Sequence, residues 1–174
     1  VRLARAHFDA FHELEACNAL IAKLAAEGDA LADYLRLAYQ GHRNAVITHA
    51  AAAVDRSAGA ISPQTLMMGR PVPSALRDLV NSAEGLGGRI KFVRNKTVGH
   101  RSSTHTNKSA WSSARLTPQE LESAIEILEG AADVVADLHG LRPYMISVLA
   151  PQGLHWLIAI LKSQAGAGTS SPAA

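Results

Sequence analysis

"LTPQELESAIEILE", residues 116–129, carries the clearest helix-start signal in the chain and decides the fold class. Thr117 and Glu120 have the spacing of a capping box, and Pro118 suits the first helical position. Apolar residues then recur every three or four positions, which predicts a buried helix face of Leu121, Ile125, Leu128, Ala132, Val135 and Leu138. Gly140 is the expected left-handed cap. We expect the acidic residues of this helix to form a solvated face in preference to a metal site: Glu120, Glu122, Glu126, Glu129, Asp133 and Asp137.

Helical spacing continues on both sides of this stretch. The apolar stripe of residues 3–24 predicts a long amphipathic helix ended near Gly28, and Asp29 is a candidate N-cap for a second helix to about Arg56. These two helices should pair antiparallel. Further helices are predicted over 62–68, over 74–99 with a kink at its glycines, and over 154–161 with Trp156 on the packed face. Residues 101–116 are predicted to form an exposed loop.

Composition agrees with an all-α fold. Apolar residues make up 48% of the chain and aromatic residues only 5%, and alanine and leucine dominate, which favours packed helices over sheets. We therefore predict an all-α bundle of about four long helices plus short helices in one domain, residues 1–164, followed by a disordered tail, residues 165–174. A single cysteine, Cys17, excludes an intrachain disulfide and a cysteine-rich zinc site. The sequence has no run of eighteen apolar residues, so we expect a cytoplasmic protein that does not enter the membrane.

Positive charge is concentrated in one segment. No acidic residue lies between Glu84 and Glu120, although the net charge of the whole chain is only +2. Seven basic residues lie in that interval: Arg89, Lys91, Arg94, Lys96, Arg101, Lys108 and Arg115. Such segregation is typical of a surface that binds a polyanion such as RNA. The alternative is a solvated loop whose composition has no function.

The motif "FVRNKTVGHRS", residues 92–102, resembles the signature of HEPN domains, in which an arginine, a polar residue and a histidine follow one another at short spacing. Here they are Arg94, Asn95 and His100. The resemblance extends over "AAVDRSAGAISPQTLM" (52–67), "RIKFVRNKTVGHRS" (89–102) and "LTPQELESAIEILE" (116–129), in the order typical of the AbiU-like HEPN proteins of abortive-infection phage defence. It implies an all-helical HEPN fold over most of residues 1–162 and a two-fold homodimer.

The resemblance also implies a reaction. HEPN ribonucleases cleave RNA without a metal or other cofactor, by attack of a ribose 2′-hydroxyl on the adjacent phosphate. His100 would transfer protons, Arg94 would contact the phosphate with its planar fork, and Asn95 would orient one of these two residues or the scissile phosphate. The flanking RNA backbone would be held by Lys91, Lys96, Arg101 and His105. A non-catalytic module that binds RNA, a nucleotide or a partner protein is the alternative, because fold alone does not determine function.

The spacing of Arg94 and His100 sets a geometric condition. Six residues apart on an ideal helix, they point about 120° away from each other. Either a distortion at Gly99 returns the histidine to the arginine, or the motifs of two protomers meet across a two-fold axis. Ser102 stands where antitoxin-modified HEPN toxins carry a tyrosine, so that mode of silencing is not expected, although an antitoxin or regulatory partner fits such a protein. The other histidines, His42 and His49 included, are expected to be structural.

Overall fold

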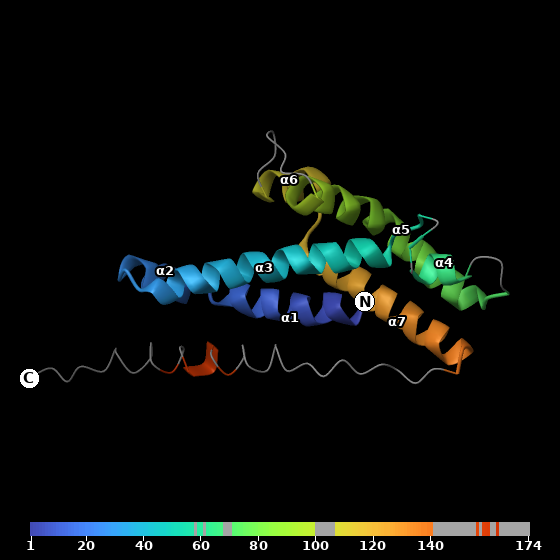
Figure 1. Cartoon of the computed structure of the whole chain (residues 1–174), viewed down its shortest axis with the longest axis horizontal. Coiled ribbons are helices and arrows are strands. Elements are labelled where there is room, and N and C mark those ends of the chain that lie inside the picture. The colour runs from blue at the N-terminus through green and yellow to red at the C-terminus, as the bar shows by residue number, and fades with distance from the viewer. Residues whose placement is uncertain are drawn as a thin grey trace, which may run out of the picture. The chain divides into compact units, whose positions relative to one another are not determined.

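The computed structural model describes residues 1–57, 59–60, 62–67, 71–99, 107–140, 156, 158–160 and 163. Within these residues every regular element is helical, which confirms the all-α fold class. The elements are α1 (Arg2–Ala16), α2 (Asn18–Ala26), α3 (Ala30–Ala53), α4 (Pro63–Met67), α5 (Ser74–Arg94), the π-helical segment η1 (Asn95–Gly99), α6 (Asn107–Ala114) and α7 (Pro118–Leu138) (Figure 1). None of the described helices is both long enough and apolar enough to cross a bilayer.

The chain divides into two compact units. The first unit comprises Val1–Arg5 and Asn44–Ile146, and the second comprises Ala6–Arg43 and Ser147–Ala174. Helices α1 and α3 each contribute residues to both units. The single domain over 1–164 stays a prediction, and the tail over 165–174 lies outside the described residues.

The second unit is a helical hairpin in which α1 and α2 run antiparallel to α3 (Figure 1). Gly28 makes the turn with a φ of 74°, and the Asp29 carboxylate accepts a hydrogen bond from the backbone N–H of Leu31 at 2.9 Å, as predicted for an N-cap. The buried stripe is also confirmed at Leu14, Cys17 and Ile21, which pack against Leu35 and Ile158.

Two details of the second unit differ from the prediction. The expected continuous helix over 3–24 is interrupted at Cys17, whose N–H bonds to the carbonyl of Leu14, three residues back, at 3.1 Å. The side chain of Trp156 was expected in the packed face, but it is 70% exposed, whereas Ile158 is buried. Two residues apart on a helix, they point to different sides, and the core accepts the aliphatic one.

The first unit is built on α5 and α7, which pack along each other. Leu76 and Val80 of α5 meet Ala131 and Val135 of α7, and further along Ala83 meets Leu128. The capping box is present as predicted, since Thr117 accepts from the Glu120 N–H and Glu120 accepts from the Thr117 N–H. The predicted face of α7 is correct for Leu121, Ile125, Leu128 and Val135, whereas Leu138 is 53% exposed.

Residues 107–114 form α6, so the loop predicted over 101–116 is wrong for this part. Ala110 and Ala114, one turn apart, are buried, and α6 packs against α5 and η1. Arg89 of α5 completes this packing, because its Nε donates to the carbonyl oxygen of Ala114 at 2.7 Å. That bond satisfies a carbonyl at the end of α6, where no intrahelical donor is available. A helix of serine, asparagine and alanine thus forms because tertiary contacts hold it.

Candidate functional site

The described part of the HEPN-like motif lies where α5 ends and η1 begins. Lys91 and Arg94 belong to the last turn of α5, and Asn95 and Lys96 open η1. The other three predicted site residues, His100, Arg101 and His105, lie outside the described residues. Arg94 and Asn95, which are consecutive in the sequence, lie on either side of the change from α- to π-helix.

A side-chain hydrogen bond accompanies the change from α- to π-helix at Asn95. The hydroxyl of Thr97 donates to the carbonyl oxygen of Val93 at 2.8 Å, four residues earlier. Thr48 and Ser82 make the same bond within regular α-helix, so this contact does not by itself explain the change. The β-branched residues Thr97 and Val98, followed by Gly99, also have low helix propensity. Segments of π-helix are rare and often occur at functional sites.

Arg94 takes a position on the buried side of α5. Ala83, Gly87 and Ile90 are buried there at spacings of four and three, and Arg94 follows four residues after Ile90. Its Nε atom is buried and has no hydrogen-bond partner among the described residues. An unsatisfied buried donor costs about 1–3 kcal/mol. Arg94 as a whole is half-buried, and guanidinium groups form paired, charge-assisted bonds with phosphate.

Two side chains next to Arg94 differ in exposure. Asn95 is exposed at the start of η1. Lys96 is half-buried, and its Nζ lies 5.8 Å from the centroid of the Phe92 ring. This contact fixes the ammonium group by its attraction to the ring face. Asn95 and Lys96 are therefore both available to a ligand that reaches Arg94.

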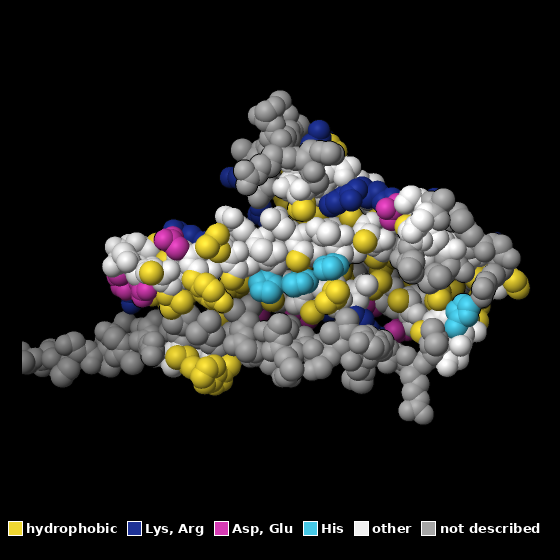
Figure 2. All heavy atoms as spheres, in the orientation of Figure 1, with side chains coloured by type: hydrophobic (Ala, Val, Ile, Leu, Met, Phe, Trp, Pro, Cys, Tyr) yellow, Lys and Arg dark blue, Asp and Glu magenta, His cyan; other side chains and the backbone are white. Residues whose placement is uncertain are grey.

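Lys91 forms an ion pair within the protein. Its Nζ lies 3.4 Å from Asp55 Oδ1, and both side chains are about one-third exposed, 34% and 37%. Hydrogen bonds from Ser57, together with the nearby Lys91 ammonium, lower the pKa of Asp55. The charge of Lys91 is thus partly balanced, and a phosphate would compete with Asp55 for it. Figure 2 shows Lys and Arg side chains beside an acidic one over α5.

The charge of Arg89 is paired within the protein, so Arg89 adds little to the predicted basic surface. Its guanidinium forms two parallel hydrogen bonds with the Glu120 carboxylate, Nη1 to Oε1 and Nη2 to Oε2, each 2.9 Å long. These bonds raise the pKa of Arg89 and lower that of Glu120 to about 2. Arg89 therefore joins α5, α6 and α7. Among the described cations of the segment, Arg94, Lys96, Lys108 and Arg115 form no ion pair with a described carboxylate.

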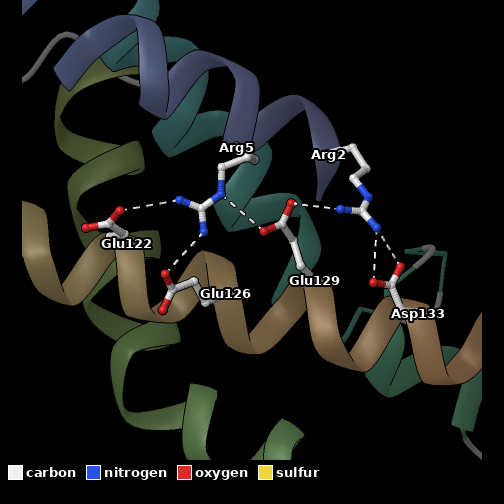
Figure 3. Close-up of polar contacts among 6 residues, drawn as sticks. All are labelled: Arg2, Arg5, Glu122, Glu126, Glu129 and Asp133. Carbon is white, nitrogen blue, oxygen red and sulfur yellow. Dashed lines mark hydrogen bonds and ion pairs between the residues drawn. The ribbon is translucent and has the colours of Figure 1, made fainter. Parts of the chain in front are cut away.

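Arginines of α1 pair with the acidic face of α7 (Figure 3). The predicted solvated face is nevertheless correct for most of its length, because the side chains of Glu122, Glu126 and Asp133 are 41%, 64% and 47% exposed, whereas that of Glu129 is 15% exposed. Arg5 contacts Glu122 at 3.5 Å, Glu126 at 3.7 Å and Glu129 at 3.1 Å. Arg2 contacts Glu129 at 3.4 Å and Asp133 at 2.8 Å. In the part of the chain that the structure describes, no group of three or more His, Cys, Asp or Glu side chains is arranged to hold a metal ion.

Residues without any functional motif in the sequence surround a pocket beside Lys91. The pocket has a volume of about 220 Å³ and is lined by Val54, Arg56, Gln64, Glu84, Gly87, Gly88 and Lys91. The available signal was the glycine pair at 87–88, which predicted a kink, whereas α5 runs through it without interruption. Comparisons of the chain with known protein-family models, with curated proteins and with solved structures find no match.

Proposed function

We propose that the chain is an endoribonuclease of the HEPN type that cleaves RNA without a metal ion. The observation that carries the proposal is the buried, unpartnered Nε of Arg94 at the junction of α5 and η1. A protein gains no stability from burying an arginine donor without an acceptor. Arg94 as a whole is half-buried, so an RNA phosphate would meet its guanidinium at the surface, with Asn95 and Lys96 beside it.

The proposed reaction is a transfer of the phosphoryl group within the RNA strand. The ribose 2′-oxygen attacks the adjacent phosphorus, the bond from phosphorus to the 5′-oxygen breaks, and a 2′,3′-cyclic phosphate and a 5′-hydroxyl remain. His100 takes the proton of the 2′-hydroxyl, and a proton is returned to the leaving 5′-oxygen. Arg94 stabilises the negative charge that builds on the phosphate. The role of His100 rests on the resemblance of the motif.

The same resemblance supports the biological setting. We propose that the enzyme acts in phage defence of the abortive-infection kind or as the toxin of a toxin–antitoxin system, and that it works as a two-fold homodimer. The two copies of Arg94 and His100 would share one cleft, as the two-fold homodimer of the HEPN resemblance implies. Lys91, Lys96, Arg101 and His105 would hold the RNA backbone on either side of the scissile phosphate.

The test is cleavage of single-stranded RNA by the purified protein in the presence of EDTA, followed by detection of the cyclic phosphate on the products. Arg94→Lys and His100→Ala should each lower the cleavage rate by at least about a hundredfold. The lysine keeps the positive charge but lacks the planar fork, and the alanine removes the group that transfers protons. Arg77→Lys is the matched control, since Arg77 is an exposed arginine of the same helix. Full activity in Arg94→Lys would contradict the assignment.

A non-catalytic RNA-binding module is the second candidate. The observation that favours it is the pairing of Arg89 with Glu120 and of Lys91 with Asp55, which leaves a weaker positive surface than the sequence predicts. Its signature would be salt-dependent binding of RNA without any product bearing a cyclic phosphate.

A further inference from the structure

Helix α6 has little intrinsic tendency to be helical. It is only eight residues long, and three of its residues are serine, with an asparagine at its start. Serine and asparagine favour caps and turns, and isolated helices shorter than about 12 residues are marginal in water. The helical state of α6 therefore depends on its contacts with α5 and η1.

The apolar surface that α6 buries is small. Ala110 and Ala114 are buried, with one methyl group each, and Trp111 is half-buried. Helix α7, by contrast, buries larger side chains such as Leu121 and Ile125. Since stabilisation by burial follows the apolar area that leaves water, α6 is held more weakly than α7.

The C-terminal end of α6 has a strained backbone. Arg115 has a φ of 49°, in the left-handed region, and the N–H of Leu116 donates to the carbonyl oxygen of Trp111 at 3.3 Å. Glycine is the usual residue at such a helix end, and Gly28 and Gly140 take it elsewhere in this chain, with φ values of 74° and 64°. A residue with a Cβ is strained there, so this end of α6 is less stable than a glycine would make it.

Arg89 fastens the same end of α6 from α5. Its Nε donates to the carbonyl oxygen of Ala114 at 2.7 Å. Its Nη1 and Nη2 donate to Glu120 at 2.9 Å each, and Glu120 accepts in turn from the Thr117 N–H at 2.9 Å. The first turn of α7 thus orients the guanidinium, and the charge of this donor makes its bond to Ala114 stronger than a bond between neutral groups.

We propose that α6 is a latched segment, which opens by local unfolding while α5 and α7 stay packed, and that the pair of Arg89 and Glu120 is the latch. Two described clusters join α5 to α7 without any residue of α6. The α5 and α7 residues of these clusters are Leu76, Val80, Ala83, Leu128, Ala131 and Val135. Segments with few buried apolar contacts are those that open below the free energy of global unfolding.

Opening would uncover the side of α5 and η1 against which α6 packs (Figure 1). Asn95 and Lys96 belong to η1, so the closed form is the one that holds them in the positions described above. In this respect the inference rests on the proposed function: the site would lose activity when α6 opens, which is regulation by an order–disorder transition.

Hydrogen exchange of the wild-type protein tests the opening itself. The amides of residues 111–116 report on α6 and those of residues 124–131 on α7, since the first four N–H groups of a helix lack intrahelical partners. We expect the α6 amides to exchange at least about a hundredfold faster, with little dependence on denaturant, because local opening exposes little surface. Exchange of both sets at the same rate would overturn the proposal.

A variant of Glu120 tests the latch. Glu120→Gln removes the charge partner of Arg89 and should speed exchange of the α6 amides at least about tenfold. Arg77→Gln, at an exposed arginine of α5, is the matched control and should leave their exchange unchanged. Wild-type exchange in Glu120→Gln would show that this pair does not hold α6 closed.

Two glycine variants test the strain at the end of α6. Arg115→Gly relieves the strained backbone and should slow exchange of the α6 amides. Ser113→Gly, at an exposed position inside the same helix, is the matched control and should speed it, because glycine is a poor helix former. Faster exchange in both variants would contradict the strained end.

Substitutions that keep α6 from packing test whether it opens alone. Ala110→Asp places a charge on the buried side of α6 and should leave its amides unprotected, with those of α7 still protected. Adding Ala114→Asp should lower the melting temperature no further, because the open segment makes neither contact. Ala124→Asp, the same change at a buried alanine of α7, is the control and should abolish protection in both helices. Loss of protection in α7 on Ala110→Asp, or a further fall in the double variant, would overturn the proposal.

The RNA cleavage assay separates this inference from the proposed function. Where the wild type cleaves RNA, Ala110→Asp should lower the rate at least about tenfold, whereas Ser113→Asp, on the exposed side of α6, should not. An unchanged rate in Ala110→Asp would contradict regulation by α6. A wild type that does not cleave RNA would overturn the proposed function alone, because the exchange experiments decide on the opening of α6 without it.

Discussion

Arg89 and Glu120 form an ion pair with two hydrogen bonds, each 2.9 Å long, that joins the C-terminal part of α5 to the first turn of α7. The same carboxylate closes the capping box with Thr117, and the same arginine caps α6 at Ala114. One residue pair thus holds the three helices around the end of α5. The position of the candidate site therefore depends on contacts that lie outside the HEPN-like motif.

Variants of Glu120 separate its two roles. Glu120→Gln retains the capping box, because glutamine can accept from the Thr117 N–H, but it loses the charge pair with Arg89. Glu120→Ala loses both, so its melting temperature should be the lower of the two. Thr117→Ala, which removes only the cap, should cost about 1 kcal/mol, or about 2–4 °C. Thermal unfolding followed by circular dichroism measures all three, and equal melting temperatures for Gln and Ala at position 120 would contradict the two-role account.

The ion pair of Arg89 and Glu120 should stop stabilising the fold only at an unusually low pH. Hydrogen bonds from Arg89 and Thr117 lower the pKa of Glu120 from 4.5 to about 2. A carboxyl with a lowered folded pKa stabilises the fold fully above its ordinary pKa and loses this effect as the pH falls through the folded value. The difference in melting temperature between wild type and Glu120→Gln should be constant from pH 7 to 5, decrease below 4.5 and vanish near 2. A difference that is already lost at pH 5 would be inconsistent with the pair.

Replacing Arg94 should separate stability from activity. Arg94→Met keeps the length of the side chain and removes the buried Nε donor that has no described partner. We expect the variant to be more stable by up to about 1 kcal/mol and inactive, which is the trade-off typical of residues kept for function. Chemical denaturation and the RNA cleavage assay provide the two measurements. A clear loss of stability would show that Arg94 has a structural partner.

A histidine pair makes the second unit sensitive to pH. Nδ1 of His7 and Nδ1 of His42 are 2.9 Å apart, so one ring must donate and the other must accept. Burial lowers the pKa of His42 below 6.5. The unfolded chain therefore binds a proton at His42 more readily than the folded chain does. The free energy of unfolding keeps its full value above pH 6.5 and decreases as the pH falls below it.

The corresponding experiment compares melting temperatures between pH 8 and 5. His42→Gln should have a shallower pH dependence than the wild type, since the titrating ring is gone. His12→Gln, at an exposed histidine of α1, is the control and should follow the wild-type curve. Identical slopes for wild type and His42→Gln would exclude this pair as the source of the pH dependence.

A composite site can be tested by mixing inactive chains. If Arg94 and His100 act across a two-fold axis, heterodimers of Arg94→Ala and His100→Ala chains contain one site with both residues intact. Mixing and exchanging the two variants should then restore about a quarter of the wild-type activity, since half of the dimers are mixed and each has one complete site of two. Full-rate cleavage by a monomer at micromolar concentration would show that both residues meet within one chain.

The helices that were predicted correctly are those whose signals are local. The Thr117–Glu120 capping box and the Asp29 cap involve residues at most three positions apart, so the sequence alone specifies them. Helix α6 was missed because its stability comes from Arg89, 25 residues away from Ala114. The ion pairs of Arg5 with α7 span more than a hundred residues and have no local signature.

In the candidate site, too, only the features with a local sequence signal were predictable. The motif marks Arg94 and Asn95, and the spacing of Ala83, Gly87 and Ile90 could have shown that Arg94 lies on the buried side. The pocket beside Lys91 could not have been predicted, because Gln64 of α4 and the α5 residues line it together only in the tertiary fold. The pairing of Lys91 with Asp55, 36 residues away, likewise depends on the fold.

In the proposed reaction the ribose 2′-hydroxyl is the nucleophile. Two oligonucleotides that differ at one atom examine this step, an RNA and the same RNA with a single 2′-deoxyribose on the 5′ side of the cleaved phosphate, both assayed with EDTA. We expect cleavage of the first at that bond, with a cyclic phosphate on the product, and no cleavage of the second there. Cleavage of both oligonucleotides at the same rate would contradict it, because water and not the ribose would then be the attacking group.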